Sequence, residues 1–337
     1  MSSQQLCAGM SFQEGGNWYC RPVDSITYTN VGTSGQYDEV VKMDDTTGKC
    51  ETQPRSFSGP MAPFNEPMSL HFRGPLHLKQ LAVYLPADKQ KALVGACKAS
   101  SPGFERAAYY HAENQAAEGL TFLGNFGGIG SGRFTFAFGN SLSYINANGT
   151  SGSPQSVVLA DTLIPSGKEV IVMTDQKCDD SCGFVQQGSV GYKGFPSENR
   201  IILMDFTMPH TDDDDRPAFW MLNARIPHSA QYGCNCHASG CGEIDVFEVL
   251  TTGENKAKTA FHAFGSQKGG DSNYFYRPSG NTIRLAVVFE AEAGRIQVNI
   301  LNKVQPDEEF RKALSRADVT RPIVDSDMSE SVFPLAG

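Results

Sequence analysis

Long hydrophobic runs are missing from this chain of 337 residues. No stretch approaches the roughly 20 consecutive apolar residues that a membrane-spanning helix needs. The final segment, SVFPLAG, is too short for the hydrophobic tail of a lipid-anchor signal. The first residues, MSSQQLCAGM, have neither the basic start nor the apolar core of a signal peptide. The sequence therefore predicts a soluble chain without a membrane span.

Concentrated positive charge is missing as well. The chain has 28 Lys and Arg residues against 37 Asp and Glu residues, for a formal net charge of -9, and no stretch gathers basic residues into a patch. A phosphate backbone would be repelled by such a surface. We expect a monomer that binds neither nucleic acid nor a cofactor.

Cysteine, by contrast, is plentiful, with nine residues. Most of them fall in close groups, which predicts disulfides and an oxidising compartment. These are Cys7 with Cys20, Cys178 with Cys182, and Cys234, Cys236 and Cys241. The alternative is a zinc site in which His237 joins the last three cysteines. The usual C-x2-C spacing of zinc sites is absent, so we favour disulfides, with Cys97 as the odd thiol and no metal.

Secretion fits the cysteines but not the first residues of the chain. We expect that an export sequence was removed and a starting methionine added. Asn148, Gly149 and Thr150 form an acceptor triplet for N-glycosylation, which agrees with export. A run of four aspartates at 212–215 could hold calcium, but a solvated loop before a proline is the preferred interpretation.

Short strand-like segments dominate the chain, and turn residues separate them. We expect a β-rich N-terminal module over 11–86, a connector over 87–104, a catalytic jelly-roll domain over 105–305 and a C-terminal extension over 306–337. The one good helix candidate is EEFRKALSRA at 308–317. The predicted fold is all-β: a two-sheet antiparallel β-sandwich, a concanavalin-like jelly roll, with the N-terminal module packed on it or contributing to it.

The segment CGEIDVFEVL, at 241–250, has strong strand propensity but carries three acids: Glu243, Asp245 and Glu248. Regular alternation would place Glu248 on the apolar face, away from the other two. One extra residue at 246 or 247, a β-bulge, would bring all three acids onto one face. We therefore predict a bulge in this strand.

Three acids on one strand suit a retaining glycosidase. On a concave sheet the two glutamate carboxyl groups could approach to roughly 5 Å, the separation that double displacement requires. One would act as the nucleophile and the other as acid and base, while the aspartate tunes their pKa values. The alternative is that the three acids lie on a solvent-exposed face of the sheet and have no part in catalysis.

The motif EIDVFE resembles the E-x-D-x-x-E signature of family 16 glycoside hydrolases. Longer stretches, including WYCRPVDSITYTNVG, CGFVQQGSVGYKGF and PAFWMLNARIPHSAQYGCNCHASGCGEIDVFEVL, resemble fungal cell-wall proteins of the Tos type, over about residues 18 to 305. The resemblance implies a secreted wall protein acting on β-glucan, most plausibly β-1,3-linked. It assigns Glu243 as nucleophile, Asp245 as the assisting acid and Glu248 as acid and base. His237 stands where the family commonly has tryptophan.

Four further residues are candidates for substrate binding. Trp220 could stack on a sugar or belong to the core, and Asn223 could bind a hydroxyl or only end a strand. His262 lies on the next predicted strand, where it could face the acids. His237 is the fourth. Two functions follow: a metal-independent retaining endo-β-glucanase, able to transfer glycosyl units as well, or a glucan-binding wall protein without catalysis.

Overall fold

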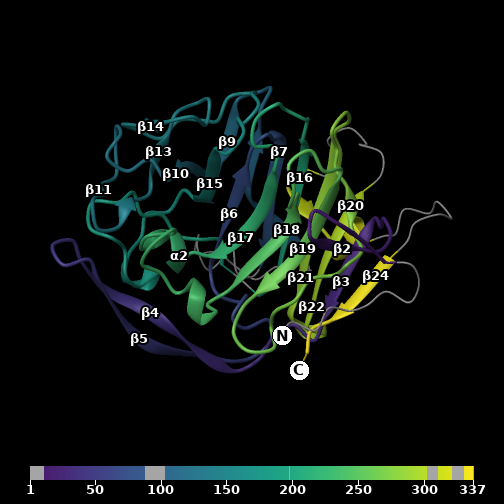
Figure 1. Cartoon of the computed structure of the whole chain (residues 1–337), viewed down its shortest axis with the longest axis horizontal. Helices are drawn as coiled ribbons and strands as arrows, with labels where there is room; N and C mark the ends of the chain where they lie inside the picture. The colour runs from purple at the N-terminus through teal and green to yellow at the C-terminus, as the bar shows by residue number, and fades with distance from the viewer. Residues whose placement is uncertain (1–10, 88–102, 197, 302–309, 321–329, 337) are drawn as a thin grey trace.

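Two large β-sheets form the body of the molecule (Figure 1). The computed structural model describes residues 11–87, 103–196, 198–301, 310–320 and 330–336. Within these ranges, no helix has the length and apolar character needed to cross a membrane. The predicted all-β, sandwich-like class is confirmed.

The first sheet, which we call the acid-bearing sheet, has nine antiparallel strands among the described residues. In spatial order they are β14 (Gly152–Ser153), β13 (Ser143–Ile145), β10 (Leu120–Gly124), β15 (Glu169–Thr174), β6 (Met68–Arg73), β17 (Ala218–Asn223), β18 (Glu243–Glu248), β19 (Lys256–His262) and β20 (Phe275–Tyr276).

The second sheet also has nine strands in the described part of the chain, and only the last pair is parallel. In spatial order they are β23 (Ala313–Leu314), β8 (Phe104–His111), β7 (His77–Pro86), β16 (Arg200–Thr207), β21 (Ile283–Glu290), β22 (Arg295–Leu301), β3 (Ser25–Thr29) and β24 (Glu330–Pro334), with β9 (Ala116–Glu118) paired to β8.

Smaller elements surround the two sheets. Three hairpins pair β1 (Phe12–Glu14) with β2 (Asn17–Tyr19), β4 (Gly35–Asp44) with β5 (Lys49–Phe57), and β11 (Phe134–Thr135) with β12 (Gly139–Asn140). The short helices are α2 (Arg225–His228), α3 (Arg316–Thr320), η1 (Asp180–Cys182), η2 (His237–Ser239) and η3 (Ala291–Ala293).

The N-terminal segment is built into both sheets. Strand β6 lies between β15 and β17, and β7 lies between β8 and β16, so this segment supplies central strands as well as the β4–β5 hairpin. Most of the predicted connector, 88–102, lies outside the described residues. The two segments therefore share one core.

The helix predicted over 308–317 is wrong where the structure describes it. Residues 302–309 lie outside the described part, Ala313 and Leu314 form β23, and the helix α3 begins only at Arg316. Leu314 is buried with Phe310 in an apolar cluster over the second sheet. Pairing with β8 and this burial outweigh the helical propensity of the segment.

The main hydrophobic core lies between the sheets. Ile244, Val246 and Phe247 of β18 belong to it, and the ring of Phe247 meets that of Phe206 from the second sheet edge to face at 5.4 Å. Sandwiches bury one face of each sheet in this way. The opposite face of the acid-bearing sheet is therefore available for polar side chains.

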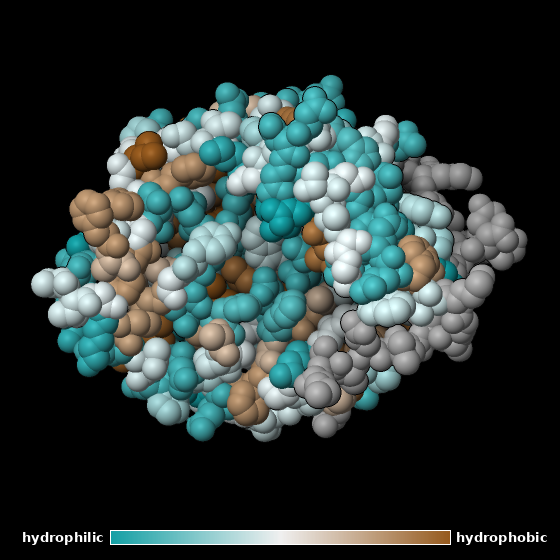
Figure 2. Space-filling view, viewed as in Figure 1, coloured by the Kyte–Doolittle hydropathy of each residue, from teal (hydrophilic) through white to brown (hydrophobic). Residues whose placement is uncertain are grey.

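The long β4–β5 hairpin sweeps across the lower left of the molecule (Figure 1). Tyr37 and Phe57 from this hairpin join Trp220 and Leu222 in a second apolar cluster, on the face of β17 that points away from the core. Hydrophobic side chains also gather at the left of the same view, where β11 to β14 lie (Figure 2). The acid-bearing face is thus partly covered by apolar groups.

Disulfides link three pairs of the described cysteines: Cys50 with Cys234, Cys178 with Cys182, and Cys236 with Cys241. Cys20 is also disulfide-bonded, whereas Cys7 and Cys97 lie outside the described residues. Spacing predicted the pair Cys178 with Cys182. It grouped Cys234 with Cys236 and Cys241 without choosing a pair, and it gave Cys50 no partner, whereas Cys234 bonds Cys50. The bond from Cys50 joins the start of β5, next to the turn of the hairpin, to the loop before β18.

The aspartate run at 212–215 is not wholly a solvated loop. Asp215 is only 1% exposed. It accepts hydrogen bonds from Arg277 Nη1 at 2.9 Å and His210 Nδ1 at 2.7 Å. Burial of this carboxylate is tolerated because it is paired with cationic and hydrogen-bonding groups. Asp215 is therefore a structural residue that joins the loop to the segment after β20.

Candidate active site

A β-bulge shapes the acid-bearing strand β18. Asp245 lies opposite Trp220 of β17, whereas Phe247 lies opposite the adjacent residue, Phe219. Val246 is therefore one extra residue on β18, and the pairing with β19 shifts in the same interval. Ile244, Val246 and Phe247 all enter the core. The bulge predicted from the charge pattern is confirmed.

The bulge brings Glu243, Asp245 and Glu248 onto the face of the sheet that points away from the core. Each carboxyl group has one oxygen held by a basic side chain: Glu243 Oε2 by His237 Nε2, Asp245 Oδ2 by His262 Nε2 at 2.8 Å, and Glu248 Oε1 by Arg73 Nη2 at 3.0 Å. The other oxygen of each acid has no hydrogen bond to any described residue. Three carboxyl groups are thus fixed in orientation while each keeps one oxygen for a ligand.

Asp245, the middle acid, has a raised pKa. Burial raises its pKa to about 7, and the charges of Glu248 and Glu243 act in the same direction, while the hydrogen bond from His262 opposes the rise. Asp245 is 8% exposed, so water stabilises its charged form poorly. A carboxyl group that stays partly neutral near pH 7 can donate a hydrogen bond as well as accept one.

Both histidines at the site have raised pKa values, whereas burial alone lowers the pKa of a histidine. The hydrogen bond with Glu243 raises the pKa of His237, and the hydrogen bond with Asp245 raises that of His262, although burial opposes both shifts. Their rings lie 6.4 Å apart between centroids. The candidate site therefore contains two imidazoles that protonate more readily than an isolated histidine.

Trp220 lies beside the acids but is only 7% exposed. Its ring stacks on His71 of β6, with 5.2 Å between centroids and 27° between planes, and the guanidinium of Arg73 lies 5.8 Å from its centroid. The ring belongs to an apolar cluster and its residue lies opposite Asp245 in the strand register, while stacking on a sugar stays a prediction. Its exposed edge is small.

A polar network that the sequence did not reveal continues along this face from Trp220. His71 Nδ1 lies 2.6 Å from Glu169 Oε1, and its Nε2 lies 2.7 Å from Ser69 Oγ. Glu169 also accepts hydrogen bonds from Gln231 Nε2 at 2.7 Å and Tyr232 Oη at 2.6 Å. Although burial opposes ionisation, these hydrogen bonds, first that of His71, lower the pKa of Glu169. The network fixes the ring on which Trp220 stacks.

One sequence signal could have revealed this network. In SLHFRG the polar residues Ser69, His71 and Arg73 alternate regularly with buried apolar residues. Alternation alone places all three on one face of a strand. It does not say which strands lie beside it, and that long-range pairing brings Arg73 to Glu248.

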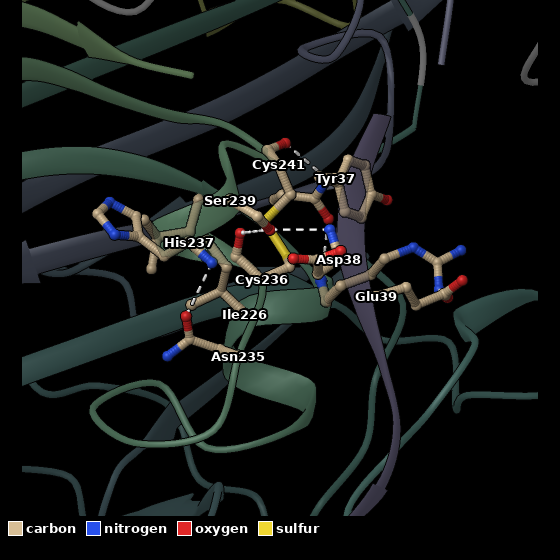
Figure 3. The surroundings of a disulfide bond; sticks show 12 residues. Tyr37, Asp38, Glu39, Ile226, Asn235, Cys236, His237, Ser239 and Cys241 are labelled. Carbon is tan, nitrogen blue, oxygen red and sulfur yellow. Dashed lines mark hydrogen bonds and ion pairs between the residues drawn. A yellow bond between two sulfur atoms is a disulfide. The ribbon is translucent and has the colours of Figure 1, made fainter. Parts of the chain in front are cut away.

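The disulfide between Cys236 and Cys241 closes the loop that carries His237. In Figure 3 the imidazole of His237 points away from the disulfide, while β4 passes on the other side of the loop. Ser239 Oγ accepts a hydrogen bond from the backbone N–H of Asp38 at 2.9 Å and donates one to the Cys236 carbonyl (Figure 3). The loop is therefore anchored on both sides, which holds His237 against Glu243.

Asn223 ends β17 beside the start of β18, where its backbone N–H donates to the Gly242 carbonyl at 2.9 Å. It is 2% exposed, and its amide donates to Glu66 Oε2 at 2.9 Å and to the Cys241 carbonyl at 3.0 Å. Its oxygen accepts from the backbone N–H of Arg225 at 3.1 Å. Both the nitrogen and the oxygen of the amide are therefore used within the protein. Asn223 helps to hold the loop that carries the disulfide of Cys241.

Two hollows open beside the acids, and His262 lines both of them. One, of about 370 Å³, is also lined by His237 and Phe264, and the other, of about 290 Å³, by Trp18 and Lys258. A larger cavity of about 380 Å³ is lined among others by Lys193 and Arg225, and none of the three spaces has an acid of β18 in its lining. We take the hollows at His262 as the candidate site because His262 lines both and bonds the carboxyl group of Asp245.

The N-glycosylation triplet lies far along the sheet from the acids. Asn148 is exposed in a turn between β13 and β14. This position leaves its amide accessible, as the acceptor prediction requires.

The chain matches a known protein family along most of its length. Residues 24–86 and 102–321 match the N-terminal and C-terminal parts of the family described as "Cell wall protein YJL171C/Tos1". No solved structure matches the chain.

Three relatives illustrate the similarity along nearly the whole length. A Candida albicans protein named "Probable circularly permuted 1,3-beta-glucanase TOS1" is 31% identical, over 93% of this chain and 93% of its own. A Saccharomyces cerevisiae protein of the same name is 29% identical, over 89% and 90%. An Arthroderma benhamiae protein, "Probable circularly permuted 1,3-beta-glucanase", is 32% identical, over 96% and 94%. The chain therefore belongs to the YJL171C/Tos1 family of fungal cell wall proteins.

Proposed function

We propose that the protein is a retaining endo-hydrolase of β-1,3-glucan in the fungal cell wall, and that it can also transfer glycosyl units to a second glucan chain. The names of its relatives support the substrate class and the reaction. The observation that carries the proposal is the bulge of β18, which turns three carboxyl groups to one face and leaves one oxygen of each without a partner among the described residues.

In the first step of the proposed mechanism, Glu243 attacks the anomeric carbon through Oε1, the oxygen that His237 does not hold. The bond from that carbon to the glycosidic oxygen breaks, and Glu248 donates its proton to the leaving oxygen through Oε2. The product is a glycosyl ester on Glu243. Arg73 keeps Glu248 in place through its other oxygen.

In the second step Glu248, now ionised, takes a proton from water, whose oxygen bonds to the anomeric carbon as the ester to Glu243 breaks. If a sugar hydroxyl takes the place of water, the same step transfers the chain. Asp245 lies between the two glutamates in sequence and on the same face. Its neutral form can donate a hydrogen bond to the ionised nucleophile.

The disulfides among the described residues agree with action outside the cell, where such bonds persist. The wall is a network of polysaccharide, and the family description places its members there. We propose that the chain works as a monomer and carries a glycan at Asn148.

Product analysis tests this function. The protein is incubated with laminarin, reducing ends are counted, and the anomeric configuration of the first products is followed by proton NMR. Retention predicts that β-configured ends appear first and then equilibrate, and endo-action predicts mixed oligosaccharide lengths. First products in the α-configuration would contradict the double displacement. Binding of laminarin without any release of reducing ends would favour the glucan-binding wall protein instead.

A further inference from the structure

We infer that the N-terminal hairpin β1–β2 completes a sugar subsite, in which Trp18 stacks on one glucosyl residue of the substrate chain. This inference rests on the proposed function, because it extends the site built around Glu243, Asp245 and Glu248. The comparisons assign no role to Trp18, which lies before the N-terminal part of the family as matched over 24–86.

The subsite is the hollow of about 290 Å³ between the hairpin and β19. It is lined on one side by Gly16, Asn17 and Trp18, and on the other by Lys258, Ala260 and His262. Its volume is at the lower end of small-molecule sites, which suits one sugar ring rather than several. In Figure 1, β2 lies on the right of the molecule, beside β19 and β20.

His262 links this hollow to the acids. The Nε2 atom of His262 bonds Asp245, and the same side chain lines this hollow and the neighbouring one at His237. A glucan chain whose cleaved bond lies over Glu243 and Glu248 would therefore extend past His262 toward the hairpin.

Strand alternation orients Trp18 away from the part of the hairpin that anchors it. Tyr19 is fully buried, its ring meets that of Tyr274 edge to face at 5.7 Å, and its hydroxyl donates to Glu254 Oε2 at 2.7 Å. Neighbouring residues on a strand point to opposite sides, so Trp18 points the other way. The indole is half-buried and makes no ring contact or hydrogen bond with any described side chain. A free indole face of this kind can stack on a pyranose ring.

Lys258 connects the hairpin to the acid-bearing sheet. Its Nζ donates to the Trp18 carbonyl at 2.9 Å, and its residue lies opposite Glu248 in the strand register. Burial lowers the pKa of Lys258 to about 8, which the charges of Asp271 and Glu254 partly offset. The backbone of Trp18 is thus fixed to the strand next to the acids, while its ring stays free for a ligand.

Binding is measured by calorimetry in a Glu243→Gln background, so that the result does not depend on turnover. The ligands are β-1,3-linked tri- and hexasaccharides. In this background Trp18→Ala should weaken the hexasaccharide about ten-fold and the trisaccharide less than two-fold, because only the longer chain reaches the hairpin. Trp18→Tyr, which keeps an aromatic face, should restore most of the loss. Phe136→Ala is the matched control, since Phe136 is fully exposed on the β11–β12 hairpin at the other end of the same face.

Fluorescence quenching supplies a second measurement that needs no destabilising change. The chain has two tryptophans, and Trp220 is already buried. Acrylamide should therefore quench mainly Trp18, and the hexasaccharide should protect it, with no protection left in a Trp18→Phe variant. Equal losses for both ligand lengths, or quenching that the hexasaccharide does not change, would overturn the subsite. Absence of turnover in the unaltered protein would instead contradict the proposed function.

Discussion

The imidazole Nε2 of His262 lies 2.8 Å from Oδ2 of Asp245, and this contact joins two adjacent strands at the centre of the candidate site. Burial and the flanking glutamates push the pKa of Asp245 up to about 7, whereas His262 opposes that rise. The protonation of this pair therefore changes within the range in which most enzymes are assayed.

The dependence of activity on pH should reflect the ionisation of Asp245 and His262. With protonated Asp245 as the active form, kcat/KM on laminarin should fall on the alkaline side with an apparent pKa near 7. His262→Phe removes the hydrogen bond that lowers the pKa of Asp245, so the alkaline limb should move to higher pH. His77→Gln, on β7 of the second sheet, is the control and should leave the limb in place. An alkaline limb that is unchanged, or that moves to lower pH, in His262→Phe would contradict this role.

Asp245 should also limit the stability of the fold at alkaline pH. Its pKa in the folded chain lies above its ordinary value of 3.8, so the stability that it contributes is complete below about pH 4 and is lost as the pH rises through about 7. Asp245→Asn cannot ionise. We expect its melting temperature to exceed that of the unaltered protein by a few degrees at pH 8 and by less at pH 5. Asp213→Asn, at an exposed residue for which the described part of the chain shows no ion pair, should show no such pH dependence. A gap that widens at pH 5 would refute the assignment.

Arg73 is expected to act by holding Glu248. Its Nη2 bonds Glu248 Oε1 at 3.0 Å, and its Nε donates to the Arg216 carbonyl at 2.7 Å. Arg73→Met should lower kcat about ten-fold with little change in KM, because the carboxyl group loses its fixed orientation. Arg216→Gln is a matched control, since its side chain pairs with Asp214 and its carbonyl remains. Equal kinetics for both variants would show that the ion pair does not position Glu248.

The long-range disulfide should stabilise the fold more than the short one. Cys50 and Cys234 are separated by 184 residues, and Cys178 and Cys182 by only 4. A bond that closes a longer loop removes more freedom from the unfolded chain. Replacing both cysteines of the long-range pair by serine should cost on the order of 2–5 kcal/mol in denaturant unfolding, and replacing the short pair should cost less. The reverse order would contradict the loop-entropy explanation.

The sequence predicted the local features of this site well. The bulge at Val246 could be predicted because three acids in an apolar strand fit one face only with an extra residue. The placement of His262 beside Asp245 followed because the next strand along the chain pairs with β18. Both are short-range relationships that a hydrophobic pattern encodes.

Relationships between distant segments could not be predicted in the same way. Arg73 reaches Glu248 because β6 pairs with β17, and no local pattern records that choice. His71 and Glu169 meet for the same reason, through the pairing of β6 with β15. The partner of Cys50 likewise depends on where the β4–β5 hairpin folds over the sheet.

The most direct test of the account is the Glu243→Gln variant. The loss of the nucleophile should reduce the release of reducing ends from laminarin by about 10³-fold or more, while laminarin binding stays within a few-fold of the unaltered protein. Glu118→Gln, on β9 of the second sheet, should keep full activity. If Glu243→Gln retains the activity of the unaltered protein, the three acids of β18 are not the catalytic centre.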